Sequence, residues 1–414
     1  MLIIVIGTVL VAAGCGLAWA LRARSQTARL IGFPIAVIAA LIGFTTVGVS
    51  LWARTATDNS QFARALVWGD SAYGDQHRFP SRPFAGAPQP VLFELVPNSP
   101  MADYRSPETD QPLPEVLEQS ETTAFVVLRN NELLYEEYFN GSGREETQTS
   151  FSVAKSFVAT LVGIAIDEGM IGGLDEPITL YLPELADRDD RFRDITVLHL
   201  ITMSSGLSFE DGSSPWADPA NTYHGTDLRT AALSTPEIVG PPGRVFDYND
   251  WNVILLGLIL ERSSGMSVAG FTERYLWQPM GAEAAGSWSL DSQEAGFEKM
   301  FVGVNGRAID FVKLGWLYLH GGRNGETQVV PSQFVRDATK LDISTDPTAQ
   351  YQYLWWIDQD RNAYFAQGDH GQFIYVHPDT EIVIVRHGTT PADVDWVEFM
   401  GDLALWLEAN GEPR

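Results

Sequence analysis

Two long apolar runs near the N-terminus constrain the fold of this chain more than any other feature of its sequence. Residues 2–21 and 30–52 contain no charged side chain. An α-helix needs ~20 residues to cross the hydrocarbon core of a bilayer, and each run has this length. Pro34 lies in the first turns of the second run, where its missing N–H is tolerated. We therefore expect residues 1–54 to form a two-helix transmembrane anchor.

The loop between the two runs sets the expected orientation of this anchor. It carries Arg22, Arg24 and Arg29 and no acidic residue. Short basic loops stay in the cytoplasm, so the rest of the chain is expected on the periplasmic or extracellular side of the cytoplasmic membrane. A cleaved signal peptide would carry its basic residues before the apolar run, whereas here they follow it. Lipidation of Cys15 stays open as an alternative, although the apolar run continues beyond this cysteine.

Charge and cysteine content exclude several classes of function. The chain has 27 Lys and Arg against 53 Asp and Glu, a formal net charge of −26. Nucleic acid is not expected as a partner, because a polyanion binds basic surfaces. Cys15 is the single cysteine, so no intramolecular disulfide can form. The seven histidines are scattered without metal-ligand spacing and nucleotide motifs are missing, so we expect no metal and no other cofactor.

The remainder of the chain divides by composition into an arm and a main domain. Residues 55–118 are rich in Pro, Ser, Asp and Gly, which predicts an extended arm that lies on the main domain or links it to the membrane. Residues 119–414 alternate strand-like and helical patterns, so we expect a single folded domain there.

The order of the patterns within 119–414 predicts an α+β fold. Residues 122–139 form a hairpin pattern around a central Asn-Asn pair, and two further strand patterns occupy 372–378 and 381–388. Residues 172–345 between them are mostly helical in pattern, and residues 393–410 end the chain as an amphipathic helix. We therefore expect one antiparallel sheet built from both ends of the domain, with a helical region inserted between them.

A serine and a lysine at the start of an apolar helix are the first candidate catalytic pair. Ser152 and Lys155 are three residues apart and would share one helix face. A serine hydroxyl becomes a good nucleophile when a base removes its proton, and burial can make a lysine neutral enough to do so. The N–H groups at the helix start suit a developing oxyanion. A serine N-cap is the plainer explanation of Ser152, but it leaves a lysine in an apolar stretch unexplained.

Two further segments carry candidate partners for this pair. Tyr248 precedes a helical pattern and would relay a proton between nucleophile and leaving group. Gly371 permits close backbone approach at the head of a strand, so the Gln372 N–H is a candidate partner of the Ser152 N–H in an oxyanion hole. His370 is a candidate hydrogen-bonding group for substrate. A packed aromatic residue and a glycine turn explain each segment equally well when it is taken alone.

Taken together, the three segments resemble the serine β-lactamase and penicillin-binding-protein superfamily, in its class C-like branch. There S-x-x-K opens a helix, Y-x-N lies in the helical region, and K-T-G or H-x-G lies on an edge strand. The phrases "TMSSGL" and "GDHGQFIYV" look most like the 6-aminohexanoate-dimer hydrolases of that branch. The resemblance implies that Ser152 is the acylated serine, Lys155 its base and Tyr248 the proton shuttle.

The chain departs from the superfamily pattern at two positions. Asp250 stands where asparagine is usual, which leaves its substrate-binding role open. Asp369 stands where the resemblance places the lysine of K-T-G, so no lysine is available there to bind a β-lactam carboxylate. By looser analogy, Tyr223 is expected to reach the site from the middle loop, about residues 209–241.

Three functions are compatible with these residues. We expect a membrane-anchored serine hydrolase that cleaves an amide or ester bond of a small-molecule or peptide-like substrate. A cell-wall DD-peptidase or other penicillin-binding enzyme is the second hypothesis. A non-catalytic, membrane-tethered sensor with a degenerate site is the third. The sequence determines neither the substrate nor the oligomeric state.

Overall fold

The computed structural model describes residues 26–97, 99–107, 109–340 and 350–410. By their internal contacts these residues form two units, one within residues 1–70 together with 213–216, and one of residues 71–212 and 217–414. The division at residue 70 cuts through the segment predicted as an arm, residues 55–118.

The described residues of the first unit form two helices. Helix α2 (Gln26–Ala56) includes the second apolar run, and α3 (Gln61–Trp68) begins after Ser60, whose hydroxyl accepts a hydrogen bond from the Ala63 N–H at 3.3 Å. The first apolar run, residues 2–21, lies outside the described residues. Among the described helices, no single one has the length and hydropathy of a membrane span, and one bent pair, Asp250–Ser264 with Val268–Trp277, meets these criteria by length and composition only. The expected anchor therefore stays a prediction.

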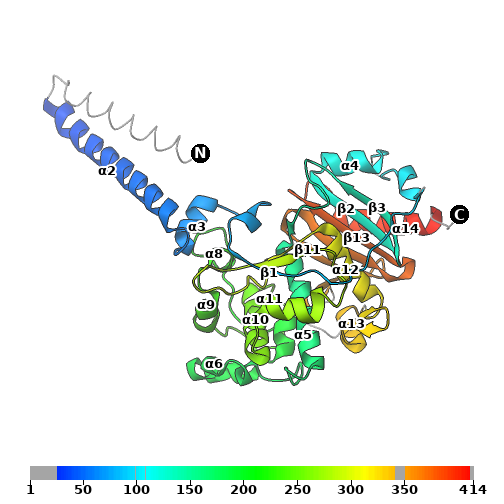
Figure 1. Ribbon diagram of the computed structural model, residues 1–414. Helices are drawn as coiled ribbons and strands as arrows, with labels where there is room; N and C mark the ends of the chain where they lie inside the picture. The colour runs from blue at the N-terminus through cyan, green and yellow to red at the C-terminus, as the bar shows by residue number, and fades with distance from the viewer. Residues whose placement is uncertain (1–25, 98, 108, 341–349, 411–414) are drawn as a thin grey trace. The chain divides into compact units, whose positions relative to one another are not determined.

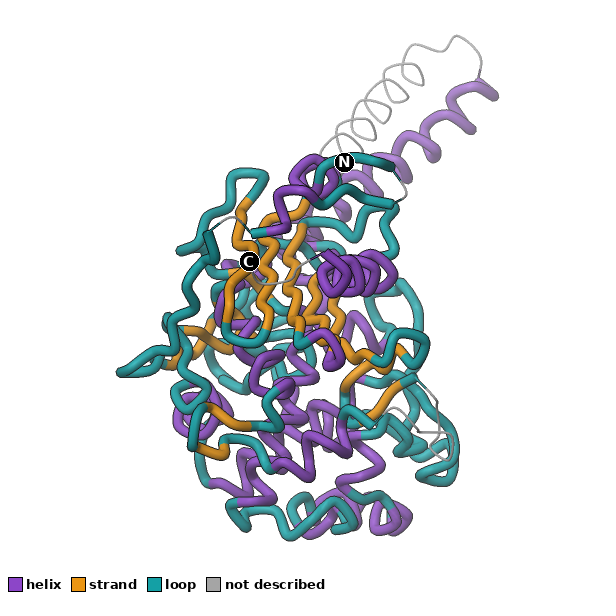
Figure 2. Tube along the Cα trace, turned by 90° about the vertical axis from the view of Figure 1, so that its right-hand side faces the viewer, coloured by secondary structure: helices purple, strands orange, loops and turns teal. Residues whose placement is uncertain are grey.

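The second unit is built around a seven-stranded antiparallel sheet, as the sequence predicts. Its spatial order is β3-β2-β13-β12-β11-β10-β9. The first two strands come from the start of the domain and the other five from its end, where the sequence analysis had identified only two. The strands are β2 (Thr122–Arg129), β3 (Glu132–Tyr138), β9 (Tyr351–Gln352), β10 (Trp355–Asp358), β11 (Ala363–Gly368), β12 (Gln372–His377) and β13 (Ile382–Gly388). Figure 2 shows these strands side by side.

Alternating side chains of the strands enter two separate cores. Val126 and Leu128 of β2 belong to a core shared with α5 (Ala154–Asp167) and α12 (Ala308–Leu319). Phe125 and Val127 point to the other face, which α4 (Leu113–Gln119) and α14 (Trp396–Asn410) cover. This two-residue period is the property of a strand that is buried on both faces of a sheet. Gly315 lets α12 approach closely, since a Cβ there would lie 2.6 Å from Val383 Cγ1.

A helical region is inserted between β3 and β9 and stands beside the sheet in Figure 1. Its central helices α5 and α10 (Asp250–Ser264) pack against each other and are almost wholly buried. Besides α12, the other α-helices described in the region are α6 (Pro183–Arg188), α7 (Val197–Ile201), α8 (Asp218–His224), α9 (Leu228–Ser234), α11 (Val268–Thr272) and α13 (Ser332–Ala338). The inserted helical region predicted from the sequence is therefore confirmed.

The segment after residue 70 lies on the main domain. Strand β1 (Ser81–Phe84) pairs with β5 (Gly286–Ser289), and the small sheet continues through β6 (Val304–Gly306) to β4 (Gln148–Thr149). A short hairpin, β7 (Arg323–Asn324) and β8 (Thr327–Gln328), lies apart from both sheets. Because β4 leads directly into the helix that carries the candidate nucleophile, the small sheet fixes the point at which that helix starts.

Candidate active site

Ser152 lies in the short 3-10 helix Phe151–Val153, at the N-terminal end of α5. The residue before it, Phe151, has a φ of 44°, in the left-handed region that side chains other than glycine rarely adopt. Such backbone strain is concentrated at functional sites, because the surrounding structure must hold it in place. The predicted spacing brings the pair together, since Lys155 Nζ donates a hydrogen bond to Ser152 Oγ at 3.0 Å.

Lys155 is buried, with 1% of its surface exposed, and all three of its ammonium donors have partners. Besides Ser152 Oγ, the ammonium contacts the Phe301 carbonyl oxygen at 3.2 Å and Asp250 Oδ1 at 2.9 Å. This arrangement explains a lysine in so apolar a stretch: the helix buries the hydrocarbon stem, while polar groups from two other segments meet the charge.

Two opposing effects act on the charge of Lys155. Burial alone lowers the pKa of Lys155, but the Asp250 carboxylate and the Tyr248 side chain outweigh that effect, so the pKa lies above its ordinary value. In the resting site, the neutral form that burial favours is therefore opposed. The reason is Asp250, whose position opposite the ammonium could not be read from the sequence.

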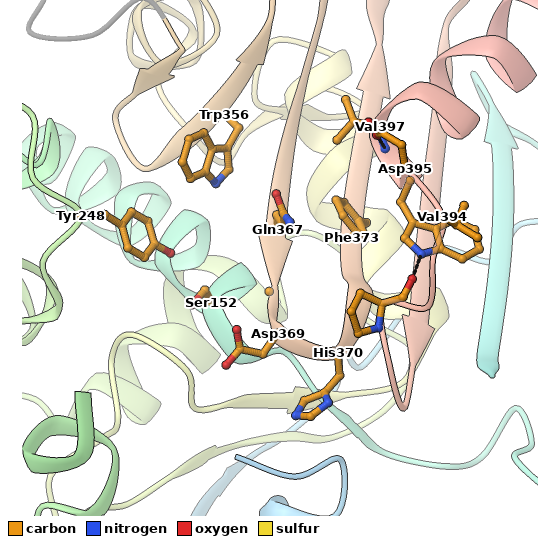
Figure 3. A pocket seen from close by; sticks show the side chains of 14 residues that line it. Ser152, Tyr248, Trp356, Gln367, Asp369, His370, Phe373, Val394, Asp395 and Val397 are labelled. Carbon is orange, nitrogen blue, oxygen red and sulfur yellow. Dashed lines mark hydrogen bonds between the residues drawn. The ribbon is translucent and has the colours of Figure 1, made fainter. Parts of the chain in front are cut away.

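Tyr248 stands on the far side of the lysine, just before α10. Its ring centroid lies 4.7 Å from Lys155 Nζ, and its ring stacks on Trp356 at 5.9 Å and meets the edge of Tyr351 at 5.9 Å. In Figure 3 the Tyr248 hydroxyl points toward Ser152. Asn249 places the residue, because its side chain caps α10 by accepting from the Trp251 N–H at 2.9 Å.

Asp250 forms an ion pair with Lys155 and is not among the residues that line the cavity at Ser152. Its second carboxylate oxygen accepts a weak hydrogen bond from Thr222 Oγ1 at 3.4 Å. The structure thus gives Asp250 an electrostatic role on the lysine, in place of the substrate contact that its sequence position suggested.

The turn between β11 and β12 forms the wall opposite Ser152. Gly368 ends β11 so close to the nucleophile that a Cβ there would lie 2.9 Å from the Ser152 nitrogen. The backbone N–H that follows, that of Asp369, is therefore the candidate partner of the Ser152 N–H in an oxyanion hole. The sequence analysis names Asp369 only for its side chain and does not single out Gly368, although a glycine at the end of a strand was a usable signal.

The same geometry corrects the predicted role of Gln372 as an oxyanion-hole donor. It pairs with Gly368 across the turn, one strand further from Ser152, and does not line the cavity. Its side chain is buried against Gly388 and His387, at 2.7 Å from the Gly388 carbonyl oxygen and 2.8 Å from His387 Nδ1. Gly371 lines the cavity, but its missing Cβ makes room for the Arg386 guanidinium, whose Nη1 would lie 2.1 Å away.

His370 borders the cavity with both ring nitrogens turned to protein groups. Nδ1 lies 3.0 Å from the Thr389 carbonyl oxygen, and Nε2 lies 3.1 Å from the Ser71 carbonyl oxygen. Ser71 comes from the segment predicted as an arm, which the structure brings to the edge of the site. The structure therefore supports a positioning role for His370 more directly than the expected contact with substrate.

Tyr223 lies near the site but does not line the cavity. Its hydroxyl donates to Asp75 Oδ2 at 2.5 Å, and burial together with this carboxylate raises the pKa of Tyr223 well above its ordinary value. Asp75 is itself buried and also accepts from Arg78 at 2.8 Å. The expected reach of Tyr223 into the site is replaced by a contact that ties the arm to the middle loop.

A cavity of about 440 Å³ opens over Ser152. Tyr248, Trp356 and Phe373 contribute aromatic surface to it, and Asp369 contributes a carboxylate (Figure 3). Within the described ranges, no group of three His, Cys, Asp or Glu side chains is arranged to hold a metal ion. The arrangement thus offers a nucleophile, a proton-carrying lysine and tyrosine, and backbone donors, which together suit acyl transfer.

A serine hydrolase of the S-x-x-K type is the class that this fold and site define. Comparison with protein families agrees, because residues 115–396 match the family described as Beta-lactamase. This chain belongs to that family.

The chain is also similar to individual hydrolases. The chain is 30% identical over 308 residues to the 6-aminohexanoate-dimer hydrolase of Paenarthrobacter ureafaciens, a match that covers 67% of this chain and 75% of the relative. It is 28% identical over 187 residues to Esterase EstB of Burkholderia gladioli, covering 41% of this chain and 47% of that esterase. Among solved structures, a candidate 6-aminohexanoate-dimer hydrolase from Bacillus anthracis superposes with a TM-score of 0.73 at 23% identity, over 86% of this chain and 97% of that one. The chain is thus an enzyme, a serine hydrolase of the β-lactamase type.

Proposed function

We propose that this enzyme cleaves an amide or ester bond through an acyl-enzyme on Ser152, with Lys155 and Tyr248 handling the proton. The observation that carries the proposal is the buried Lys155 ammonium, 3.0 Å from Ser152 Oγ and at the same time paired with Asp250. A structural serine cap would not require a buried charge beside it. The names of the two curated relatives, an amide hydrolase and an esterase, support the same class of bond.

The geometry suggests how the proton moves. An ammonium cannot accept the Ser152 proton, so the reactive form is the Lys155–Tyr248 pair after it has lost one proton. In that form the pair takes the proton as Ser152 Oγ attacks the carbonyl carbon, and the N–H groups of Ser152 and Asp369 receive the oxyanion. The Tyr248 hydroxyl then returns the proton to the departing amine or alkoxide. Water releases the acyl group by the same steps in reverse order.

The test is a comparison of the wild-type chain with Ser152→Ala. The wild type is expected to hydrolyse p-nitrophenyl esters and the 6-aminohexanoate dimer, and to gain the mass of one acyl group when the reaction is quenched early. Ser152→Ala is expected to lose both the turnover and the mass increment while keeping its circular dichroism spectrum and melting temperature. Hydrolysis by Ser152→Ala at the wild-type rate would refute the proposal.

The DD-peptidase alternative lacks a supporting observation in the site. Among the described residues that line the cavity there is no Lys or Arg to receive a substrate carboxylate. Labelling with a fluorescent penicillin separates the two functions, because a stable, stoichiometric adduct on Ser152 is expected only of a penicillin-binding enzyme.

We further propose that the chain is anchored in the cytoplasmic membrane, with the catalytic domain on the outer side. The apolar surface of α2 supports this, since Ile38, Leu41 and Phe44 are exposed. The full-length chain is expected in the membrane pellet after a high-salt wash, and protease added to intact spheroplasts is expected to cut the catalytic domain.

A matched pair of variants makes the anchoring test specific. Leu41→Arg places a charge within the apolar run, which costs about 3 kcal/mol at the centre of a span, and is expected to shift protein from the pellet to the supernatant. Leu405→Arg makes the same change at an exposed position of α14 and is expected to stay in the pellet. A wild-type chain recovered wholly in the detergent-free supernatant would contradict the anchor.

A further inference from the structure

The charged side chains that line the cavity over Ser152 are acidic. Two carboxylates, those of Asp369 and Asp395, line it, and no described lining residue is Lys or Arg. Lys155 lies directly behind the nucleophile, but its charge is paired with Asp250 at 2.9 Å. A substrate that enters the cavity therefore meets net negative charge.

The two carboxylates differ in how many hydrogen bonds they accept from the protein. Asp395 accepts hydrogen bonds from the N–H groups of Val397 and Glu398, both at 3.1 Å, and so caps the start of α14. Asp369 accepts a single hydrogen bond, from Ser71 Oγ at 3.2 Å, and within the described part of the chain it forms no ion pair. Its side chain is exposed at the cavity, where Figure 3 shows the carboxylate beside Ser152.

Ser71 fixes the position of the Asp369 carboxylate. The Ser71 hydroxyl contacts both Asp369 Oδ2 and His370 Nε2, the latter at 3.3 Å. Since the His370 ring is also held by the Thr389 carbonyl oxygen at 3.0 Å, the turn that carries Asp369 is tied down on two sides. The carboxylate is thus held in one place close to Ser152, because the preceding residue, Gly368, packs against the Ser152 nitrogen.

The wall that faces this carboxylate is aromatic. Trp356 stacks on Tyr248 at 5.9 Å, and Phe373 also lines the cavity. Aromatic faces attract cations through their negative π-surfaces, and sites that recognise quaternary ammonium groups are built from them. Neither component offers a favourable contact to an anion.

From this juxtaposition we propose that the enzyme selects substrates that carry a cationic alkylammonium group near the scissile amide or ester, with Asp369 as the specificity-determining residue and Ser71 as its positioning residue. This inference rests on the proposed hydrolysis through Ser152. It adds the charge class of the substrate, which the chemistry of acyl transfer leaves open.

Three p-nitrophenyl esters of matched shape test the proposal. Their acyl chains end in trimethylammonium, in the neutral tert-butyl group of the same shape, or in carboxylate. At a separation of ~6 Å and an effective dielectric constant of ~40, one charge pair changes an equilibrium about tenfold. We expect kcat/KM of the wild type to be about tenfold higher for the cationic than for the neutral ester, and lower still for the anionic ester.

For each Asp369 variant, the quantity compared is the ratio of kcat/KM for the cationic ester to kcat/KM for the neutral ester. A general loss of activity lowers both values alike and leaves this ratio unchanged. Asp369→Asn is expected to bring the cationic-to-neutral ratio close to one, and Asp369→Lys to invert it. Ser71→Ala frees the carboxylate and is expected to reduce the ratio part of the way. Asp190→Asn removes an exposed carboxylate from outside the cavity and is expected to leave the ratio unchanged.

The outcomes separate this inference from the proposed function. A wild-type ratio of one, or an unchanged ratio in Asp369→Asn, overturns the inference while hydrolysis through Ser152 stands. No hydrolysis of any ester by the wild type overturns the proposed function, and the inference with it. If the Asp369 variants fail to fold, the salt dependence of the wild type decides: the ratio must shrink as ionic strength rises, and a constant ratio overturns the inference.

Discussion

Replacing Gly368 by alanine is the sharpest test of the wall that faces Ser152. The residue has a φ of −137°, which alanine adopts freely, so the effect is steric and not one of backbone strain. The added Cβ would lie 2.5 Å from the Ser150 carbonyl oxygen and 2.9 Å from the Ser152 nitrogen. Ordinary contact begins near 3.4 Å, so the strand end must retreat by about 0.9 Å, the difference between 3.4 Å and 2.5 Å.

The size of the expected effect follows from this displacement. A shift of about 1 Å in a reacting geometry costs on the order of 100-fold in rate, and removing one oxyanion donor costs about 100- to 1,000-fold. We therefore expect kcat of Gly368→Ala to fall about 100-fold, with a much smaller change in KM, because the donors act chiefly in the transition state.

The assay is steady-state hydrolysis of a neutral p-nitrophenyl ester, with the melting temperature measured on the same preparations. Gly143→Ala is the matched control, since a Cβ at that position meets no atom within 4 Å. The control is expected to keep wild-type kcat. A Gly368→Ala enzyme that is folded and retains most of its kcat would show that the end of β11 does not form the oxyanion wall.

Three other variants test separate parts of the structure. Asp250→Asn removes the carboxylate that raises the pKa of Lys155, so the reactive, deprotonated form is reached at lower pH and the acidic limb of the kcat/KM profile should move to lower pH. An acidic limb that does not move would show that Lys155 takes no part in the proton transfer. Asp75→Asn removes a buried carboxylate that accepts hydrogen bonds from the Tyr223 hydroxyl and from the exposed Arg78 guanidinium. It should lower the free energy of unfolding in urea by about 1.5–3 kcal/mol, while an unchanged midpoint would show that these contacts contribute nothing. Gly315→Ala forces a methyl group against Val383 and should cost about 1–3 kcal/mol of stability, while kcat of the folded enzyme is preserved. A loss of kcat at wild-type stability would contradict a purely structural role of Gly315.

Local spacing was sufficient to predict that Ser152 and Lys155 lie in contact. Ser152 and Lys155 share one helical turn, so their contact depends on the helix alone and survives any arrangement of the rest of the domain. Tyr248 required more, because its distance from Lys155 depends on how α5 packs against α10. The family pattern supplied that information indirectly, by the order of its motifs.

Longer-range placement explains the errors. Gln372 and Gly368 are four residues apart and pair across a turn, so a small misplacement of that turn exchanges one strand for its neighbour. The strands β9, β10 and β11 were not recognised, because β9 and β10 are short and no local pattern marked β11 as the strand beside the nucleophile. The contact of Ser71 with Asp369 joins residues almost 300 positions apart, and no local pattern encodes it.

The sequence by itself determined which residues are candidates for the chemistry and which class of fold presents them. The periods of apolar residues define helices and strands, and the spacing of Ser152 and Lys155 defines a nucleophile beside an amine. Only the tertiary structure decided the electrostatics of the site. It placed Asp250 against the Lys155 ammonium, and it left Asp369 as an unpaired charge facing aromatic walls. The physical reason is that a charge acts through distance and burial, and both are set when segments far apart in the chain pack together.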